Sequence, residues 1–306
     1  MNRAVIRPRP TGRRIRDSRS RTVFRIVNLA VLAMLTLVCL LPFVNVIAMS
    51  LSKNAYVMAG QVSLWPKGFN LSSYAYMLNR PAFWSAFRMS VVRLALGSAI
   101  NLALIILTAY PLSRDDTRLA GRTFYAWFFF ITMLVGGGMI PNYILVSSLK
   151  LRNSIWALVL PGALPVFNLV LMLNFFRQVP RELEEASMID GAGHLRTLVQ
   201  IYLPVSLPAI ATIALFCMVG HWNAWFDGMI YMTQPDKIPL QTYLRGIIID
   251  LDIAEMSGDD WAAFQEISDR TLKCAQIVVA TLPILAVYPF LQRYFVSGIV
   301  LGSVKG

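Results

Sequence analysis

Five side chains with useful chemistry fall within seven consecutive positions of an otherwise apolar stretch: His221, Trp222, Asn223, Trp225 and Asp227. Ionisable side chains are costly inside a membrane and usually face protein or a water-filled cavity. Indole faces can stack on the C–H surfaces of a sugar, while amide and carboxylate groups can pair with its hydroxyls. The pattern therefore favours a path for a hydroxyl-rich solute, with four candidate residues: Trp222, Asn223, Trp225 and Asp227.

Helix packing is the alternative explanation of this cluster. Aromatic side chains concentrate at membrane interfaces, and Asn223 can form a hydrogen bond between helices. A further alternative is an intramembrane enzyme that uses His221 and Asp227 as acid and base. Their separation of six positions puts them about 120° apart around a helix, which weakens the enzyme alternative.

A second polar segment, from Glu184 to Gly191, lies between two long apolar stretches. Pro180 can open a helix there, because the first turn does not need its missing N–H. Glu184 and Glu185 place negative charge near the positive end of the helix dipole. Gly191 supplies a stop. We therefore expect a short helix followed by a glycine turn.

A second short helix should follow this turn. Its apolar residues fall at i, i+3, i+4 and i+7 and are expected to share one face, before Pro204 interrupts the pattern: Leu195, Leu198, Val199 and Tyr202. That face could fill a groove on a soluble protein, and the small residues Ala186 and Ser187 would let a partner backbone approach closely. The alternative is an ordinary loop between helices with a favourable dipole arrangement.

Composition places the chain in a membrane. Hydrophobic residues make up 57% of it and charged residues 14%, with a mean hydropathy of +0.58, whereas soluble domains carry about 25% charged residues. A spanning helix needs roughly 20 predominantly apolar residues. Arg88 and Arg93, near one end of the second such stretch, are expected to snorkel to an interface. The pattern predicts an all-α integral membrane fold with six spans, at about 24–50, 84–112, 122–149, 154–176, 204–233 and 274–296.

The distribution of charge orients these spans. Nine arginines and one acid precede Ile26, so residues 1–22 are expected to form a basic cytoplasmic tail before the membrane domain at 23–306. The loop at 177–203 and both termini then lie in the cytoplasm. The expected external loops are 51–83 and 234–273, and the second of these holds eight of the 16 acids.

Several other functions are disfavoured. The basic residues gather beside a membrane span without interleaved aromatics, which suits anionic lipid better than nucleic acid. Cys39, Cys217 and Cys274 have no paired spacing and no His cluster, so no disulfide or metal site is implied. The sequence has no phosphate-binding G-x-x-x-x-G-K-[ST] loop, so any ATP must bind another chain. A secondary transporter would predict broken half-helices and inverted repeats, and no convincing repeat is visible.

The segment Glu185-Ala186-Ser187, then Gly191, then Ile201-Tyr202-Leu203-Pro204 after nine residues resembles the EAA signature of ABC-importer permeases. Ser187 stands where a second Ala is usual. The resemblance implies that this segment couples the chain to an ATPase, through Glu184, Glu185, Ala186, Ser187, Asp190, Gly191, Leu203 and Pro204.

Further segments resemble the carbohydrate-importer permeases, and in particular the maltose-type second permease and its oligo- and polysaccharide branch: 109–114, 136–143, 221–227, 288–295 and 302–306. The resemblance implies a type I ABC-importer permease fold with cytoplasmic coupling helices in a bacterial cytoplasmic (inner) membrane. It also implies a non-enzymatic subunit without a cofactor of its own, forming half of a path for an oligo- or polysaccharide. The implied partners are a homologous permease, two ATPase subunits that bind ATP and Mg, and an extracytoplasmic solute-binding protein. Arg88, Arg93 and Arg245 would suit an acidic sugar if they line the path.

Overall fold

The computed structural model describes residues 19–114, 120–249 and 269–302. Most of the expected basic tail lies outside these residues, as do Arg118 and six acids of the second external loop: Asp250, Asp252, Glu255, Asp259, Asp260 and Glu266. Within the described residues all regular secondary structure is helical, apart from an isolated bridge between Ser52 and Phe69. The expected all-helical fold is therefore confirmed.

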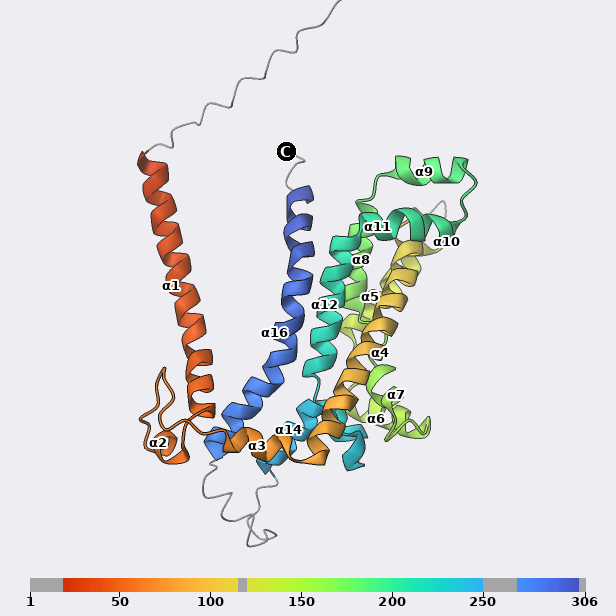
Figure 1. Ribbon diagram of the computed structural model, residues 1–306. Helices are drawn as coiled ribbons and strands as arrows, with labels where there is room; N and C mark the ends of the chain where they lie inside the picture. The colour runs from red at the N-terminus through yellow and green to blue at the C-terminus, as the bar shows by residue number, and fades with distance from the viewer. Residues whose placement is uncertain (1–18, 115–119, 250–268, 303–306) are drawn as a thin grey trace, which may run out of the picture.

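Several helices run lengthwise through the molecule (Figure 1). They are α1 (Arg19–Ser50), α4 (Pro81–Leu112), α5 (Arg122–Leu134), α8 (Val166–Arg177), α12 (Leu207–Asn223) and α16 (Asp269–Gly302). At one end lie α9 (Arg181–Ile189), α10 (His194–Thr197), the π-helix η1 (Leu198–Tyr202) and α11 (Leu203–Val205). The remaining helices are α2 (Asn54–Met58), α3 (Ser72–Leu78), α6 (Met139–Ser148), α7 (Ile155–Val159), α13 (Phe226–Tyr231), the 3₁₀-helix η2 (Pro235–Lys237) and α14 (Leu240–Ile249).

Three of the described helices, α1, α4 and α16, are long and apolar enough to cross a membrane. The number rises to five if each of two bent pairs is one span: α5 with α6, bent by 109°, and the α10–α11 segment with α12, bent by 84°. The 12-residue α8 falls short on its own, because it rises only about 18 Å against a hydrocarbon core of about 30 Å.

The bend between α5 and α6 and the break between α7 and α8 have local causes. Three glycines, 136–138, separate α5 from α6, and Gly138 has a φ of +81°, which L side chains rarely adopt. Pro161 and Pro165 interrupt the fourth expected span between α7 and α8. The helix is therefore interrupted within the expected spans 122–149 and 154–176, at breaks that hydropathy does not register.

Two buried clusters hold the bundle together. The first joins α4, α8 and α12 through the fully buried side chains of Ile105, Met172 and Ile213. The second joins α4, α12, α14 and α16, with Trp222 and Leu240 at its centre. By contrast, the apolar stretch of α1 is unburied along its length. Its first residue and the last residue of α16 lie at the end that carries α9 (Figure 1).

Candidate functional site

The expected helix and glycine turn are present at the α9 end. Pro180 precedes α9, and Glu182 and Glu184 occupy its first turn. The N–H of Gly191 donates to the carbonyl of Met188 at 3.0 Å, and the next N–H donates to the carbonyl of Ser187 at 2.9 Å. This is a Schellman ending, and it needs the φ of +76° that Gly191 adopts.

Ser187 has a local role that explains a hydroxyl where the EAA signature usually has Ala. Its Oγ lies 3.0 Å from the Oγ1 of Thr197 in α10, and also donates to the carbonyl of Glu184 at 2.8 Å. Thr197 is buried. The hydroxyl pair therefore fixes the angle between α9 and the helix that follows it.

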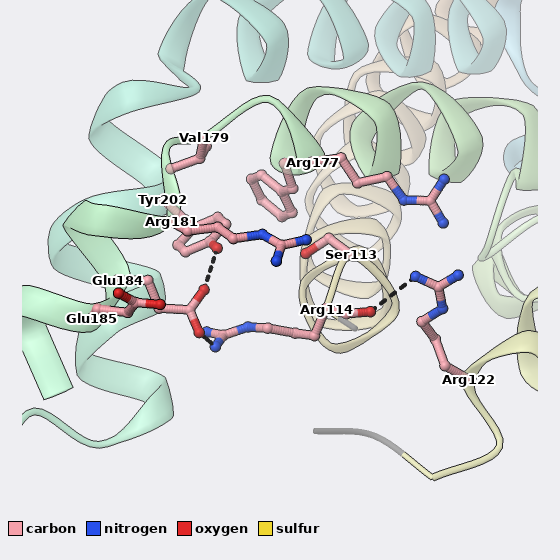
Figure 2. Close-up of a pocket in the computed structure, with 10 residues that line it drawn as sticks. Ser113, Arg114, Arg122, Arg177, Val179, Arg181, Glu184, Glu185 and Tyr202 are labelled. Carbon is pink, nitrogen blue, oxygen red and sulfur yellow. Dashed lines mark hydrogen bonds and ion pairs between the residues drawn. The ribbon is translucent and has the colours of Figure 1, made fainter. Parts of the chain in front are cut away.

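The adjacent residues Glu184 and Glu185 of α9 differ in burial. Glu184 is buried at 4% exposure, forms an ion pair with Arg114, and accepts a hydrogen bond from the hydroxyl of Tyr202 at 2.7 Å (Figure 2). Glu185, Ala186 and Asp190 are exposed. The outer surface of α9 thus presents acidic and small side chains, while its inner side is anchored by a buried charge pair.

The apolar face expected on the second helix is split. Leu198 and Tyr202 are buried, whereas Leu195 and Val199 are 72% and 58% exposed. The reason is that residues 198–202 form a π-helix, whose turn is wider than that of an α-helix, so the expected spacing no longer aligns the four residues. Leu195 and Val199 instead join Ile189, 86% exposed, as outward apolar side chains. Leu203 is half-buried and Pro204 is exposed in the first turn of α11.

A second candidate site is a cavity of about 380 Å³ between α4, α6, α8, α12 and α13. Its polar lining comprises Arg93, Asn101, Asn142, Asn168, His221, Asp227 and Tyr231. Amide, imidazole, phenol and carboxylate groups in one cavity can pair with several hydroxyls at once.

Of the four candidate path residues, the structure brings one, Asp227, to this cavity. Trp222 is 2% exposed, and its Nε1 donates to the carbonyl of Ala280 in α16 at 2.8 Å, so it packs in the core. Asn223 is exposed but does not line the cavity. Trp225 is half-buried beneath the guanidinium of Arg245, 3.7 Å from its ring centroid.

Asp227 is bound by Arg93, which the sequence pattern predicted to lie at a membrane interface. Arg93 is 3% exposed and forms a two-pronged ion pair with Asp227, whose side chain is 28% exposed. Its guanidinium also donates to the carbonyl of Ala224 at 3.2 Å, beside the break between α12 and α13. The expectation that Arg93 snorkels to an interface is wrong, because its guanidinium is buried and paired with the partly exposed carboxylate of Asp227.

His221 and Asp227 line the same cavity, so the helical-face argument that separated them is also wrong. The α12 helix ends at Asn223 and the chain is extended at Ala224, which removes the assumed 100° per residue. However, each group has its own partner. The Nε2 of His221 lies 2.5 Å from the Oδ1 of Asn101, whereas Asp227 forms its ion pair with Arg93.

Asn101 ties His221 to the interruption between α7 and α8. Its Nδ2 donates to the carbonyls of Gly162 and Ala163, both at 2.8 Å. A side chain at Gly97 would meet the His221 ring at 2.4 Å, so glycine is required for this close approach. Hydrogen bonds therefore link the polar side chains on this side of the cavity to one another.

Comparison with known proteins decides between the transport and enzyme interpretations. The family profile described as "Binding-protein-dependent transport system inner membrane component" matches residues 11–300. The chain belongs to this family. Broken helices also fit an ion-driven transporter, but membership of the binding-protein-dependent family identifies a multi-pass inner-membrane permease.

Relatives of this binding-protein-dependent permease include three with informative names. It is 41% identical over 275 residues to the Bacillus subtilis (strain 168) polygalacturonan/rhamnogalacturonan transport system permease protein YtcP, covering 90% of this chain and 96% of that one. It is 27% identical to the trehalose/maltose transport system permease protein MalG of Thermococcus litoralis, covering 94% and 99%. Its structure resembles a chain of a bacterial ABC transporter involved in the import of the acidic polysaccharide alginate, with TM-score 0.81, 33% identity, and coverage of 91% and 99%.

These likenesses confirm the resemblance seen in the sequence. The chain is a permease subunit of a binding-protein-dependent ABC importer, of the MalG-like type. Sequence reasoning missed Asn101 and Arg114 as site residues. The only signal was a polar residue inside, or just after, an otherwise apolar helix.

Proposed function

We propose that this permease forms half of the translocation path for an acidic polysaccharide or its oligosaccharides. The observation that carries the proposal is the similarity, over nine-tenths of the chain, to a polygalacturonan/rhamnogalacturonan permease and to a chain of the alginate importer. The cavity beside Asp227 supports it with hydroxyl-pairing groups. The other half would come from a homologous permease, with a solute-binding protein delivering the sugar.

The three arginines that the sequence suggested as contacts for an acidic sugar differ in the groups around them. Arg93 is engaged by Asp227, and Arg245 lies over Trp225. Arg88 is exposed and lines a separate hollow of about 500 Å³ together with Lys237 and one acid, Asp236. We therefore propose that Arg88 and Lys237 attract the acidic sugar, while the cavity beside Asp227 contacts its hydroxyls.

We further propose that α9 to α11 dock on one of two ATPase subunits, which bind ATP and Mg. The exposed face of α9 carries Glu185, Ala186 and Asp190, and Ile189, Leu195 and Val199 add outward apolar surface. Large apolar side chains exposed together indicate an interaction surface. The coupling of Glu185, Ala186 and Gly191 to the ATPase, which the EAA resemblance implies, is part of this proposal.

The six spans in this proposal are α1, α4, α5 with α6, α7 with α8, α12 with α13, and α16. The segment 177–203 and both termini are then cytoplasmic, and 51–83 and 234–273 are external. The beginning of α1 and the end of α16 lie at the α9 end, which supports a common side for them (Figure 1).

Thiol labelling tests this topology. Single cysteines replace Asp190, beside the turn after α9, and Trp65, which is 81% exposed in the 51–83 segment, in a chain lacking the three native cysteines. In intact spheroplasts, a membrane-impermeant maleimide should label position 65 and spare position 190 until the membrane is opened. Labelling of position 190 in intact cells would contradict the topology.

Reconstitution tests the transport function. Proteoliposomes should contain this permease, its homologous partner permease, the two ATPase subunits and the binding protein. We expect ATP to drive uptake of an oligogalacturonate, with a neutral maltodextrin of the same length as the control. Preferential uptake of the neutral sugar would refute the acidic substrate, and uptake driven by an ion gradient without ATP would refute ATP coupling.

A further inference from the structure

A buried charge pair joins the α9 segment to the end of α4. Arg114 lies two residues after the end of α4, is 7% exposed, and forms an ion pair with Glu184 of α9 (Figure 2). Its guanidinium lies 4.3 Å from the ring centroid of Tyr110 and 5.5 Å from that of Tyr202. The cation therefore has a carboxylate on one side and aromatic rings around it.

Tyr202 brings a third element to this carboxylate. It lies in η1, and its hydroxyl donates to the Oε2 of Glu184 at 2.7 Å. Its ring packs edge-on against Tyr110 of α4 at 5.1 Å and against Phe176 of α8 at 5.4 Å. The α9, η1 and α4 segments thus meet at one buried carboxylate, and α8 packs on the same aromatic group.

Such a junction resists sliding. Separating a buried ion pair leaves a charge without its partner, which is strongly unfavourable, and charge-assisted hydrogen bonds are short and directional. A displacement of α9 will therefore move the end of α4 with it. The α4 helix also carries Asn101 and Arg93, which line the cavity, and Asn101 is about 17 Å along the helix from its last residue, Leu112.

We propose that Arg114, Glu184 and Tyr202 form a transmission junction, in which Arg114 is a positioning residue for ATP-driven transport. This inference rests on the proposed docking of an ATPase on α9. The junction lies beneath the docking surface and does not touch the ATPase. It converts a movement of α9 into a movement of α4 and of the cavity wall that α4 provides.

Three variants test the junction in the reconstituted complex. Glu184→Gln removes the charge but keeps an acceptor for Tyr202. Tyr202→Phe removes the donor but keeps the ring. The double variant Arg114→Met with Glu184→Leu replaces the pair by apolar side chains, which buried sites often tolerate without loss of folding. Arg152→Gln is the control, because Arg152 lies over the Tyr143 ring, 5.5 Å from its centroid, and is exposed.

The measured quantity is solute imported per ATP hydrolysed, beside copurification of the ATPase and thermal stability. We expect the ATPase to copurify with all variants, and the double variant to lose about ten-fold in imported solute per ATP, within the ordinary range of coupling between sites. The Arg152 variant should match wild type. If the folded double variant imports as much solute per ATP as wild type, the junction only packs the helices together and does not transmit movement.

Loss of ATPase copurification in Glu184→Gln would instead place Glu184 on the docking surface and also overturn the inference. Failure of the underlying proposal looks different, because the ATPase would then copurify with variants of the exposed face of α9. The two failures are therefore distinguishable in the same preparation.

Discussion

The Ala186→Glu variant is expected to lose ATP-driven uptake almost completely. Ala186 is exposed on the outer face of α9, between Glu185 and Ser187, where a docked ATPase would approach most closely. An unpaired charge in a buried interface costs roughly 3 kcal/mol or more. A loss of that size weakens association on the order of 100-fold.

Copurification of the ATPase and substrate-stimulated ATP hydrolysis measure this effect. Ala120→Glu is the matched control, because Ala120 is also exposed, precedes α5, and lies outside the α9 segment. We expect the control to assemble and transport normally. Normal assembly and uptake in the Ala186 variant would contradict docking on α9.

The second large effect is expected at Asp227. Its removal in Asp227→Leu leaves the guanidinium of Arg93, 3% exposed, without its counterion. Removing one partner of a buried pair destabilises a protein by roughly 3 to 5 kcal/mol. We therefore expect a low yield of folded permease and an early thermal transition in detergent.

The double variant Arg93→Met with Asp227→Leu separates stability from transport. Replacing both charges by apolar side chains of similar size often restores stability, so the folded yield should recover. Uptake should stay low, because Asp227 is partly exposed to the cavity and no longer offers a carboxylate. Recovery of both yield and uptake would show that the pair serves packing alone.

The α9 segment was predictable because its signals are local. Pro180 marks the start of the helix and Gly191 its end, and both act through neighbouring backbone groups. The long apolar helices α1, α4 and α16 were predictable in approximate position, since hydropathy depends on composition over about 20 residues. Hydropathy does not detect the break at Ala224 or the bend at 136–138, because at both places a helix ends inside an expected span.

The two buried ion pairs were not predictable from the sequence. Arg93 and Asp227 are 134 positions apart, and Arg114 and Glu184 come from different helices with several elements between them. Their pairing depends on how α4 packs against α13 and α9, and neither periodicity nor spacing records such packing. For the same reason, Trp222 looked like a sugar platform in the sequence, although its neighbours in α4 and α16 bury it.

Cross-linking from α9 tests the central claim most directly. A single cysteine at position 186, in a chain lacking Cys39, Cys217 and Cys274, is placed in the assembled importer with a short thiol-reactive cross-linker. We predict a product containing this permease and the ATPase, and no such product from a cysteine at position 65 on the opposite end. An importer that transports with ATP but yields the ATPase product only from position 65 would contradict docking on α9.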